Sequence, residues 1–535
     1  MPIRKALSAL RRGLRWEHGV LVLLVLLSCA SLLHWLHIRG APYSTINNEV
    51  IYLEVADQIY GAIGTGPTLR LLRIPDHTAP LPSWMAALLW KLFGRTYRNA
   101  VLVNLLFTPI LVLSTYRMAR ELCTSRSALL AAFLVSAFPL MYTMQRYFLM
   151  DYALSALVAL GGALYLTSRD FTRPLPTLTL GLVVGLISLT KLTAWAFIIG
   201  PALYALARAR RYRPRKGILI VSVLAGATLS MLWYAPNWMD IIGFARTATG
   251  DFQFFERPSS FVQQMLFYPK GLVFGELTPL VTLIAAFLVL RLLTKRKLPA
   301  FLSMWTVSSL AILTLVGPQW WRYSLPILPA IATIIACGVD SVPGRWGMLL
   351  AAALPLYLGA LFCTLSFGVG LSGGFPMVDS KDFRLYSVSA VPFGPPEHEQ
   401  NFRIVSAISK VVEPDAEVSI LWMNPERVRI LPDDLHHVAS FMDELQRARS
   451  IVFDRYPSCQ RNEHQEKSYV LTVGRNSLME EGATSSNESM EGCFPDDLTC
   501  LRELKRGFLS GRGNRSAILE ILLDDSQVAE LFLCS

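Results

Sequence analysis

Charge is scarce in this chain. Asp, Glu, Lys and Arg make up 17% of its 535 residues, whereas soluble domains carry about 25%. Hydrophobic residues reach 53%. Long stretches with almost no charge are typical of membrane-spanning helices, since about 20 apolar residues cross a hydrocarbon core of about 30 Å. The shortage of charge therefore excludes an ordinary soluble protein.

Several binding motifs are also missing. The sequence has no Gly-rich phosphate loop, no GxGxxG and no internal repeat. Its eight cysteines include no CxxC pair, which argues against a structural zinc site. No cofactor is indicated; a divalent metal stays open, but no residue pattern points to one. The net charge of +11 is not gathered on a basic face with interleaved aromatics, so nucleic acid is not an expected partner.

Apolar runs predict eleven membrane-spanning helices and hence an α-helical polytopic membrane protein. The run from Leu175 to Leu206 is too long for one helix at about 1.5 Å per residue, so we expect it to fold back near Thr190 and Lys191. The expected spans are residues 17–37, 99–117, 127–143, 152–168, 175–190, 192–207, 217–234, 272–292, 300–316, 323–339 and 347–369.

Basic residues predict the orientation of these spans. The loop 208–216 holds six Lys and Arg residues, and cytoplasmic loops are enriched in both. We therefore place this loop and the tail 1–16 in the cytoplasm, with a transmembrane domain at 17–372 that includes a long outer loop at 38–98. A cleaved signal peptide is the alternative for the N-terminus, but no clean small-residue cleavage site closes its apolar run.

An odd number of spans places the hydrophilic segment 373–535 outside the cytoplasm. Amphipathic patterns at 399–412 and 434–448 alternate with a short apolar run at 417–422 and strand-like runs at 450–453, 469–473 and 517–523. This alternation predicts a soluble extracytoplasmic α/β domain with a mostly parallel sheet. Two disulfides are expected there, in one of three pairings of Cys459, Cys493, Cys500 and Cys534.

Ionisable residues in or beside membrane spans are costly, so each is a candidate functional residue. Glu49 follows the first span and comes directly after Asn48. Its carboxylate could act as a general base that accepts a proton from an attacking hydroxyl. It could equally be a helix-start carboxylate that satisfies free N–H groups.

Arg146 and Asp151 flank a short stretch before the fourth span. A spacing of five residues does not stack them on one helix face, so we expect different partners for each. Arg146 could bind a phosphate through its planar guanidinium, or anchor the helix at the interface beside Tyr142 and Tyr147.

Two further cations occur where spans do not require them. Lys191 interrupts an apolar run and is expected to face an anion or a wet cavity, with snorkelling to the interface as the alternative. Arg322 stands among tryptophans that an aromatic belt explains, although the belt does not explain the arginine. His77 has no Cys or His at ligand spacing, so metal binding by it is a weak hypothesis.

These residues share one expected side of the membrane. Cations and carboxylates at one lipid–water interface suit a reaction in which an anionic lipid phosphate leaves while an acceptor is deprotonated. The residues are Glu49, Arg146, Asp151, Lys191 and Arg322.

Five segments in this order resemble motifs of the polytopic C-type glycosyltransferases, especially the bacterial group similar to protein O-mannosyltransferases and the lipid A aminoarabinose transferase. The resemblance covers about residues 17–370. The segments are Asn48-Glu-Val-Ile-Tyr-Leu-Glu-Val-Ala56, then His77-Thr-Ala-Pro-Leu-Pro-Ser-Trp84 with Lys91-Leu-Phe-Gly94, Ala128–Pro139 with Arg146 and Asp151, Gly185–Lys191, and Arg322-Tyr-Ser-Leu-Pro-Ile-Leu-Pro329.

The resemblance implies inverting transfer of a sugar from a polyprenyl-phosphate donor to a lipid, glycan or protein acceptor. It implies an enzyme of the bacterial inner membrane that works at the outer face of the bilayer, with the C-terminal domain covering the site. The implied catalytic residues are Glu49, Asp151 and Asn48, and the implied substrate-binding residues are His77, Arg146, Lys191, Arg322 and Tyr323.

The chain departs from the family at Asn48, where the family usually has the Asp that is assigned as its catalytic base. An amide cannot be that base. Either Glu49 takes the role, Asp151 shares it, or the chain is altered or inactive. A transporter or flippase of lipid-linked sugars is the rival class, but it would more often show repeated halves.

Overall fold

The computed structural model divides the chain into a helical unit and a unit of strands, which we describe separately. The structure describes residues 16–39, 47–64, 68–74, 77–212, 215–250, 260–315 and 319–367, and the strands between 417 and 534.

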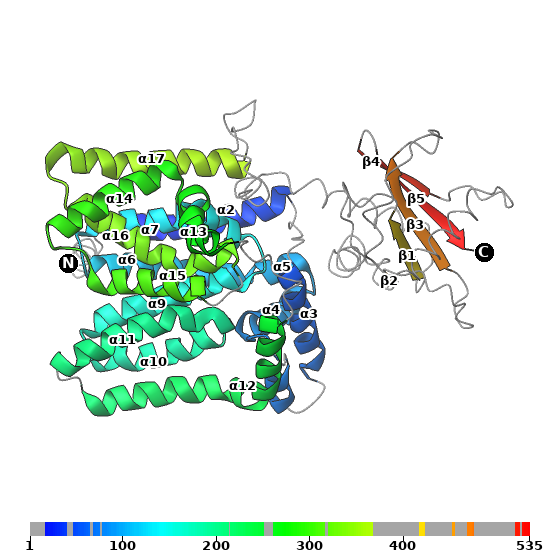
Figure 1. The fold of residues 1–535 in the computed structure, drawn as a ribbon, viewed down its shortest axis with the longest axis horizontal. Helices are drawn as coiled ribbons and strands as arrows, with labels where there is room; N and C mark the ends of the chain where they lie inside the picture. The colour runs from blue at the N-terminus through cyan, green and yellow to red at the C-terminus, as the bar shows by residue number, and fades with distance from the viewer. Residues whose placement is uncertain are drawn as a thin grey trace, which may run out of the picture. The chain divides into compact units, whose positions relative to one another are not determined.

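The helical unit is a bundle of long helices with shorter ones across one end (Figure 1). In chain order its elements are α2 (Trp16–Arg39), α3 (Asn47–Ala62), η1 (Thr68–Arg73), α4 (Leu81–Phe93), α5 (Tyr97–Val101), α6 (Val103–Arg120), α7 (Ser125–Ala137), α8 (Pro139–Gln145), α9 (Met150–Ser168), α10 (Pro174–Ser188), η2 (Leu192–Ala194), α11 (Trp195–Tyr212), α12 (Lys216–Gly250), α13 (Phe261–Gly271), η4 (Leu272–Glu276), α14 (Pro279–Thr294), α15 (Ala300–Leu315), η5 (Trp321–Ile327), α16 (Leu328–Asp340) and α17 (Gly344–Phe367).

Many of these helices are suited to a membrane. Within the described residues, seven helices are long and apolar enough to cross one, or nine if each of two bent pairs counts as one span. The apolar helices α10 and α15 are shorter. Every expected span overlaps one of these helices, but length and composition support fewer than the eleven expected. The expected fold-back is confirmed, because α10 ends at Ser188 and α11 begins at Trp195.

Two expected spans are not straight helices. Residues 127–143 bend by 61° between α7 and α8, and residues 261–294 bend by 115° between η4 and α14. Proline is the cause in both cases, since Pro139 and Pro279 each begin the second helix. Proline has no main-chain N–H to donate to a carbonyl of the preceding turn, but it is well suited to the first position of a helix. The expected span at 272–292 therefore starts as a π-helical turn, and α14 begins only at Pro279.

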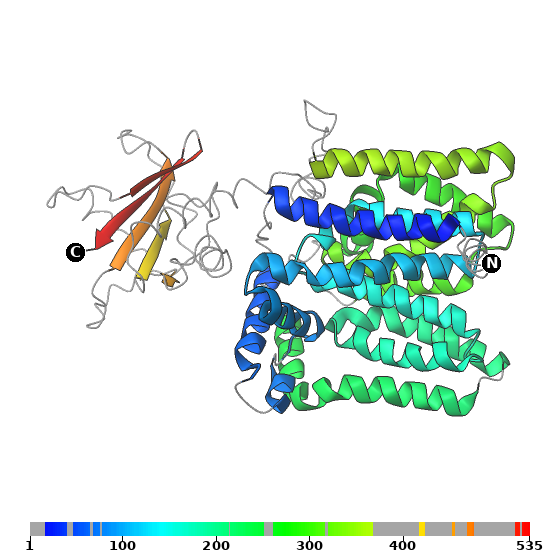
Figure 2. The ribbon, with the colours of Figure 1, turned by 180° about the vertical axis from the view of Figure 1, so that it is seen from behind.

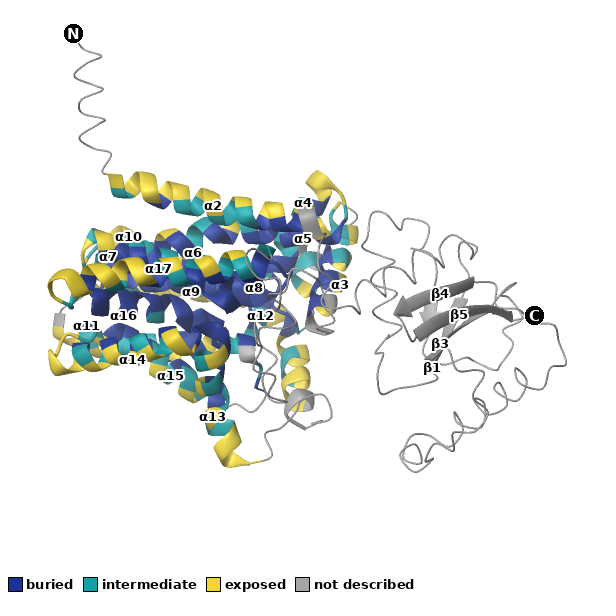
Figure 3. Cartoon of the chain, turned by 90° about the horizontal axis from the view of Figure 1, so that it is seen from above, coloured by how far each residue is buried: buried dark blue, intermediate teal, exposed yellow. Residues whose placement is uncertain are grey.

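Burial separates the inner helices from the outer ones (Figure 3). In the most apolar stretch of α9, 78% of the residues are buried, and in that of the span that contains α16, 83% are buried. The corresponding share is only 17–22% in α2, α12 and α17. The outer helices expose Leu, Val, Met and Trp side chains, which suits contact with lipid. The inner helices carry the buried polar residues described below.

Helices α3, α4 and α5 lie across one end of the bundle (Figure 2). Thr96 caps α5 by accepting a hydrogen bond from the Asn99 N–H at 3.1 Å, and its carbonyl accepts one from the Trp90 indole at 2.7 Å. Ser83 of α4 donates to the Tyr52 carbonyl of α3 at 3.2 Å. These contacts fix α3 against the other two helices and so place the side chains of its first two turns.

The second unit contains a five-stranded sheet of order β2-β1-β3-β5-β4. The expected mostly parallel sheet is wrong in detail: β1 pairs with β2 and β3 in parallel, but β5 pairs with β3 and β4 antiparallel. Only two residues separate β4 from β5, and so short a link allows only an antiparallel pair. The strands are β1 (Glu417–Trp422), β2 (Val452–Asp454), β3 (Ser468–Arg475), β4 (Leu519–Asp524) and β5 (Gln527–Cys534).

Parts of the C-terminal predictions fall outside the described residues. These are the two amphipathic segments, 399–412 and 434–448, and Cys459, Cys493 and Cys500. Cys534 ends β5, and its side chain is not described. The two disulfides and the helical part of this domain stay predictions.

Candidate functional site

Asp151 is the centre of a buried ionic cluster. It lies in the first turn of α9, where its Oδ1 accepts a hydrogen bond from Lys191 Nζ at 2.6 Å. Its Oδ2 lies 3.4 Å from Arg322 Nε. Lys191 stands in extended backbone between α10 and α11, and Arg322 lies on the 3-10 turn η5. Breaks in two apolar stretches thus bring both cations to one carboxylate.

The Arg322 guanidinium is buried but not satisfied. The residue is 0% exposed, and none of its three side-chain nitrogens makes a hydrogen bond with any residue that the structure describes. It lies 5.0 Å from the ring centre of Trp320, and Lys191 Nζ lies 4.2 Å from that of Tyr323. Buried donors almost always have partners, so this guanidinium is suited to an anionic ligand.

The cluster carries one net positive charge, since Lys191 and Arg322 share the single carboxylate of Asp151. That charge matches the one negative charge of a phosphodiester. Aromatic rings beside the cations lower the local dielectric constant, which strengthens the attraction for an anion. The charge and geometry of the cluster therefore suit a compact anion such as a phosphate.

Helix α3 contributes a buried tyrosine to the same region. Burial raises the pKa of the Tyr52 phenol, and the positive charge of Arg322 partly offsets this effect. Asp151 and Tyr323 also act on the Tyr52 pKa, and both raise it. Tyr52 is therefore close to the ionic cluster, a position that sequence reasoning did not assign to it.

Glu49 lies in the first turn of α3 and is 1% exposed. Its Oε1 accepts a hydrogen bond from the main-chain N–H of Phe148 at 2.6 Å and a second one from the Tyr97 hydroxyl. These donors come from other segments rather than from the start of α3. Further along α3, Glu54 is exposed and Asp57 forms an ion pair of 2.5 Å with Arg95. Glu49 is thus the buried carboxylate of this helix.

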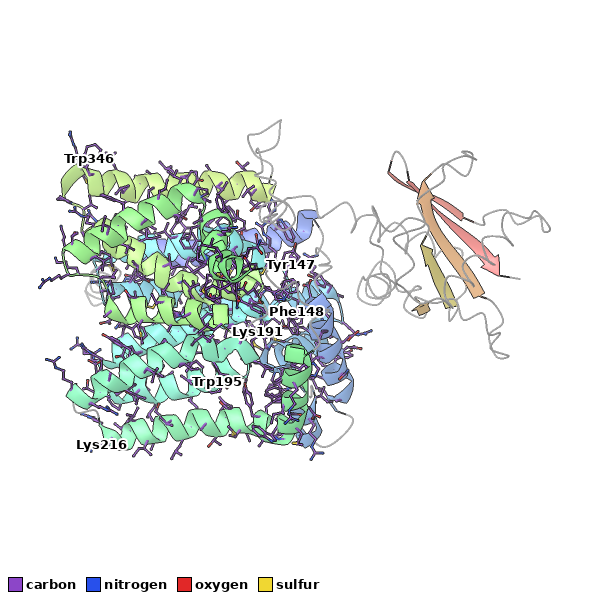
Figure 4. The ribbon with its side chains drawn as sticks, in the orientation of Figure 1. Tyr147, Phe148, Lys191, Trp195, Lys216 and Trp346 are labelled. Carbon is purple, nitrogen blue, oxygen red and sulfur yellow. The ribbon has the colours of Figure 1, made fainter. Side chains whose placement is uncertain are left out.

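One short segment joins Glu49 to the ionic cluster. Residues 146–149 link α8 to α9, and they contain Phe148, which contacts Glu49, just ahead of Asp151. Asn104 of α6 holds this segment by donating to the carbonyls of Gln145 and Tyr147, both at 2.9 Å. Figure 4 shows Tyr147, Phe148 and Lys191 at one end of the bundle, whereas Lys216 and Trp346 lie at the other.

Arg146 occupies a separate aromatic site. Its guanidinium carbon lies 4.9 Å from the ring centre of Trp35 and 5.0 Å from that of Tyr142, and it donates to the Ser366 hydroxyl. Its Nη1 makes no hydrogen bond within the described part of the chain. Arg146 and Asp151 therefore contact different partners, as their spacing predicted. These contacts do not include Lys191 or Arg322.

The two other candidate residues are His77 and Asn48. His77 stacks on Phe244 of α12, with 4.4 Å between the ring centres. Asn48 lies in the first turn of α3, but its side chain is not among the described ones. Within the described residues, no group of three His, Cys, Asp or Glu side chains could hold a metal ion.

Glu276 was not among the residues predicted from the sequence. This residue ends the π-helical turn η4 and is 0% exposed, and the Ser324 hydroxyl donates to its Oε1. The signal was present, because Glu276 is the one acidic residue in the expected span 272–292. An ionisable residue within a membrane span is a functional candidate by default.

An apolar cavity of about 420 Å³ lies among α9, α10, α11, α12 and α15. Ile187 and Trp195 line it, and they come four residues before and four residues after Lys191. Its two serines, Ser222 and Ser230, donate to main-chain carbonyls at 2.6 and 2.9 Å. The cavity is therefore suited to hydrocarbon, and its size lies in the usual range for ligand pockets.

Known proteins resemble the chain in sequence and in fold. Residues 76–239 match the family described as dolichyl-phosphate-mannose-protein mannosyltransferase. The chain is similar to ArnT from Cupriavidus metallidurans bound to undecaprenyl phosphate, with a TM-score of 0.59 and 14% identity over 96% of this chain and 98% of that one. The apo state of ArnT gives 0.59 and 13%, over 97% and 98%. No curated protein sequence matches the chain.

The archaeal oligosaccharyltransferase AglB from Archaeoglobus fulgidus, in complex with an inhibitory peptide and a dolichol-phosphate, is a more distant structure. Its TM-score is 0.45 at 12% identity, over 82% of this chain and 64% of AglB.

These comparisons confirm the resemblance that the motifs predicted. The matched segment 76–239 contains Arg146, Asp151 and Lys191, and the likeness to ArnT extends over nearly the whole chain. At 14% identity that likeness shows the fold. The protein is thus an integral, multi-pass membrane protein that shares the fold of ArnT, and its residues 76–239 are similar to the dolichyl-phosphate-mannose-protein mannosyltransferase family.

Proposed function

We propose that the protein is a glycosyltransferase that moves a sugar from a polyprenyl-phosphate donor to a hydroxyl group of a lipid, glycan or protein acceptor. The observation that carries the proposal is the buried Lys191–Asp151–Arg322 cluster with its unsatisfied guanidinium. Transfer takes place at the outer face of a bacterial inner membrane and inverts the configuration of the anomeric carbon.

Lys191 and Arg322 bind the donor phosphate. During transfer the bond between the anomeric carbon and the phosphate oxygen breaks, and the second negative charge develops on the leaving polyprenyl phosphate. Donors aimed at such a developing charge are each worth about 2.7–4 kcal/mol of transition-state stabilisation in comparable sites. The Arg322 fork supplies several N–H donors, whereas Lys191 supplies a compact charge.

Asp151 positions these two cations. Its carboxylate lies 2.6 Å from Lys191 Nζ and 3.4 Å from Arg322 Nε, so its charge is already engaged. Each of its two oxygens faces one of the cations, so the carboxylate is used to hold Lys191 and Arg322 in place. We therefore do not give Asp151 the base role that the sequence left open.

Glu49 is the general base. It accepts the proton of the acceptor hydroxyl while that hydroxyl attacks the anomeric carbon. Hydrogen bonds from Phe148 and Tyr97 to Oε1 hold the carboxylate in place. General-base catalysis contributes about 10²–10⁴-fold to such reactions.

The polyprenyl tail of the donor leaves the ionic cluster for the apolar cavity. Ile187 and Trp195, which line this cavity, come four residues before and after Lys191 in the chain, and the cavity extends along α12 from Leu219 to Met231. At about 1.5 Å per residue this is roughly 18 Å, more than half of a hydrocarbon core of about 30 Å. The ligand of one ArnT structure, undecaprenyl phosphate, has the same chemical class as the proposed leaving group.

The test is a transfer assay with the purified full-length protein. It is incubated with a panel of polyprenyl-phosphate sugars and a mixture of lipid, glycan and peptide acceptors, and release of free polyprenyl phosphate is measured. We expect release with at least one donor, and none when Arg322→Gln replaces the wild type. Equal release by the wild type and Arg322→Gln, or none with any donor, contradicts the proposal.

A further inference from the structure

A third buried carboxyl group, in addition to those of Glu49 and Asp151, has no part in the mechanism above. Glu276 is 0% exposed, and its Oε2 makes no hydrogen bond with any described residue. Its other oxygen, Oε1, accepts from Ser324. The Glu276 Oε1 atom also lies 3.4 Å from where a β-carbon on Gly271 would stand, so its own helix covers that side. One oxygen is therefore hydrogen-bonded within the described part of the protein, and the other is buried without such a bond.

The backbone around Glu276 is unusual as well. Leu277 N–H bonds to the Leu272 carbonyl at 3.0 Å, which closes the π-helical turn that ends at Glu276. Thr278 follows with φ of 78°, a conformation that costs a β-branched residue about 1–3 kcal/mol. Such turns and strained residues cluster at functional sites. A strained bend of the backbone thus holds the carboxyl group of Glu276 in the interior.

The position of Glu276 relates it to the phosphate site. Ser324, which binds its carboxyl group, comes two residues after Arg322 on the same turn η5. Tyr268 of α13 lies close enough to Tyr323, Glu276 and Asp151 to interact electrostatically with each of them. The Tyr268 hydroxyl, like Glu276 Oε2, makes no hydrogen bond of good geometry within the described residues. Two buried polar groups without a hydrogen bond therefore lie near each other, in a part of the bundle that also holds Tyr323 and Asp151.

We propose that Glu276 binds the sugar of the donor, through hydrogen bonds from sugar hydroxyl groups to Oε2. This inference rests on the proposed function and deepens it. A sugar joined to the phosphate lies within a few bond lengths of it, and its hydroxyl groups supply the donors that a buried carboxyl oxygen requires. Tyr268 offers a second polar contact from the same side. Glu276 then helps to determine which sugar is accepted, whereas Lys191 and Arg322 bind the phosphate of any donor.

The test compares two ligands that differ only in the sugar. Binding of polyprenyl monophosphate and of the polyprenyl-phosphate hexose used in turnover is measured for the full-length wild type and Glu276→Gln. The amide keeps the size of the side chain and an oxygen for Ser324. We expect affinity for the hexose donor to fall by about threefold to tenfold, as for loss of one buried hydrogen bond, while polyprenyl monophosphate binds unchanged.

The control is Glu121→Gln, the same change at a partly exposed carboxylate that pairs with Arg117 at 2.6 Å; it should alter neither affinity. If Glu276→Gln is not recovered folded, Glu276→Asp takes its place, with the same selective loss expected. Equal weakening of both ligands, or no weakening, overturns the role of Glu276 and leaves the proposed function intact. A wild type that binds neither ligand overturns both proposals.

Discussion

The main-chain N–H of Phe148 donates a 2.6 Å hydrogen bond to the carboxylate of Glu49, and this contact joins α3 to the segment that leads into α9. Asp151 follows three residues later and holds Lys191 at 2.6 Å. The proposed base and the proposed phosphate site are thus positioned by one short segment. Changes to this segment should affect both parts of the reaction together.

Lys191→Met should reduce both stability and turnover. The change leaves Asp151 buried without its nearer cation, and breaking a buried pair costs about 3–5 kcal/mol. Adding Asp151→Asn removes the uncompensated charge, so the double variant should recover thermal stability. Its turnover should remain lower by about 10²–10³-fold, because a phosphate donor is still missing. Thermal unfolding and release of polyprenyl phosphate measure the two effects.

Lys91→Met is the matched control for this prediction. Lys91 also lies over a tyrosine ring, with its Nζ 4.0 Å from the centre of Tyr60, but it is exposed on α4. Its loss should change neither stability nor turnover by much. A double variant of Lys191 and Asp151 that turns over as fast as the wild type would show that Lys191 serves packing rather than the phosphate.

Asn104→Ala should destabilise the protein. Its buried amide donates to the carbonyls of Gln145 and Tyr147, and each unpaired carbonyl costs about 1–3 kcal/mol. Asn99 offers a close comparison, since its amide also donates to two carbonyls, those of Phe93 and Gly94, at exposed positions. Water can replace Asn99 there, so Asn99→Ala should unfold near the wild-type temperature. Equal shifts in the two melting temperatures would contradict this account.

Gly226→Ala should loosen the contact between α10 and α12. A β-carbon at Gly226 would stand 2.3 Å from the carbonyl oxygen of Gly181, so one helix must move. Overpacking of this kind costs about 1–3 kcal/mol. Gly217→Ala on the same helix meets nothing within 4 Å and should be neutral or slightly stabilising. Thermal unfolding of both variants in detergent tests this prediction. Similar midpoints for the two variants would count against the close contact between α10 and α12.

A reporter fused after Ser535 tests the predicted orientation. The basic loop 208–216 and an odd number of spans place the C-terminal domain outside the cytoplasm. An alkaline phosphatase fusion at Ser535 should therefore be active, since this enzyme needs an oxidising compartment. The same fusion in the basic loop, after Arg213, should be silent. The reverse pattern would overturn the orientation.

Apolar runs predicted most of the helices because burial in lipid imposes a length and a composition that sequence displays directly. Their bends were harder to predict. Pro139 and Pro279 were visible, but a proline within an apolar run also occurs in helices that stay whole, as Pro109 does in α6. Tertiary contacts decide between these outcomes, and a single sequence does not contain them.

The site was predictable where charge interrupts hydrophobic sequence. Lys191 and Arg322 were found in this way, and the structure brings both to Asp151. Their convergence was not predictable, because 131 positions separate the two cations in the chain, from 191 to 322. Tyr97 and Tyr52 were not predicted, because an uncharged tyrosine does not interrupt the hydrophobic pattern of a helix.

Glu49→Gln should lower turnover by about 10²–10⁴-fold without loss of stability, because the proton acceptor is lost while an amide oxygen still accepts from Phe148 and Tyr97. Glu54→Gln, on the exposed face of the same helix, is the control and should be mild. Initial rates of polyprenyl-phosphate release, with melting temperatures alongside, give both quantities. Asn48→Asp adds a carboxylate next to Glu49 and should raise the rate if this chain is partly disabled. Normal turnover in Glu49→Gln would rule out Glu49 as the base, and activity seen only after Asn48→Asp would make the native chain a non-catalytic relative.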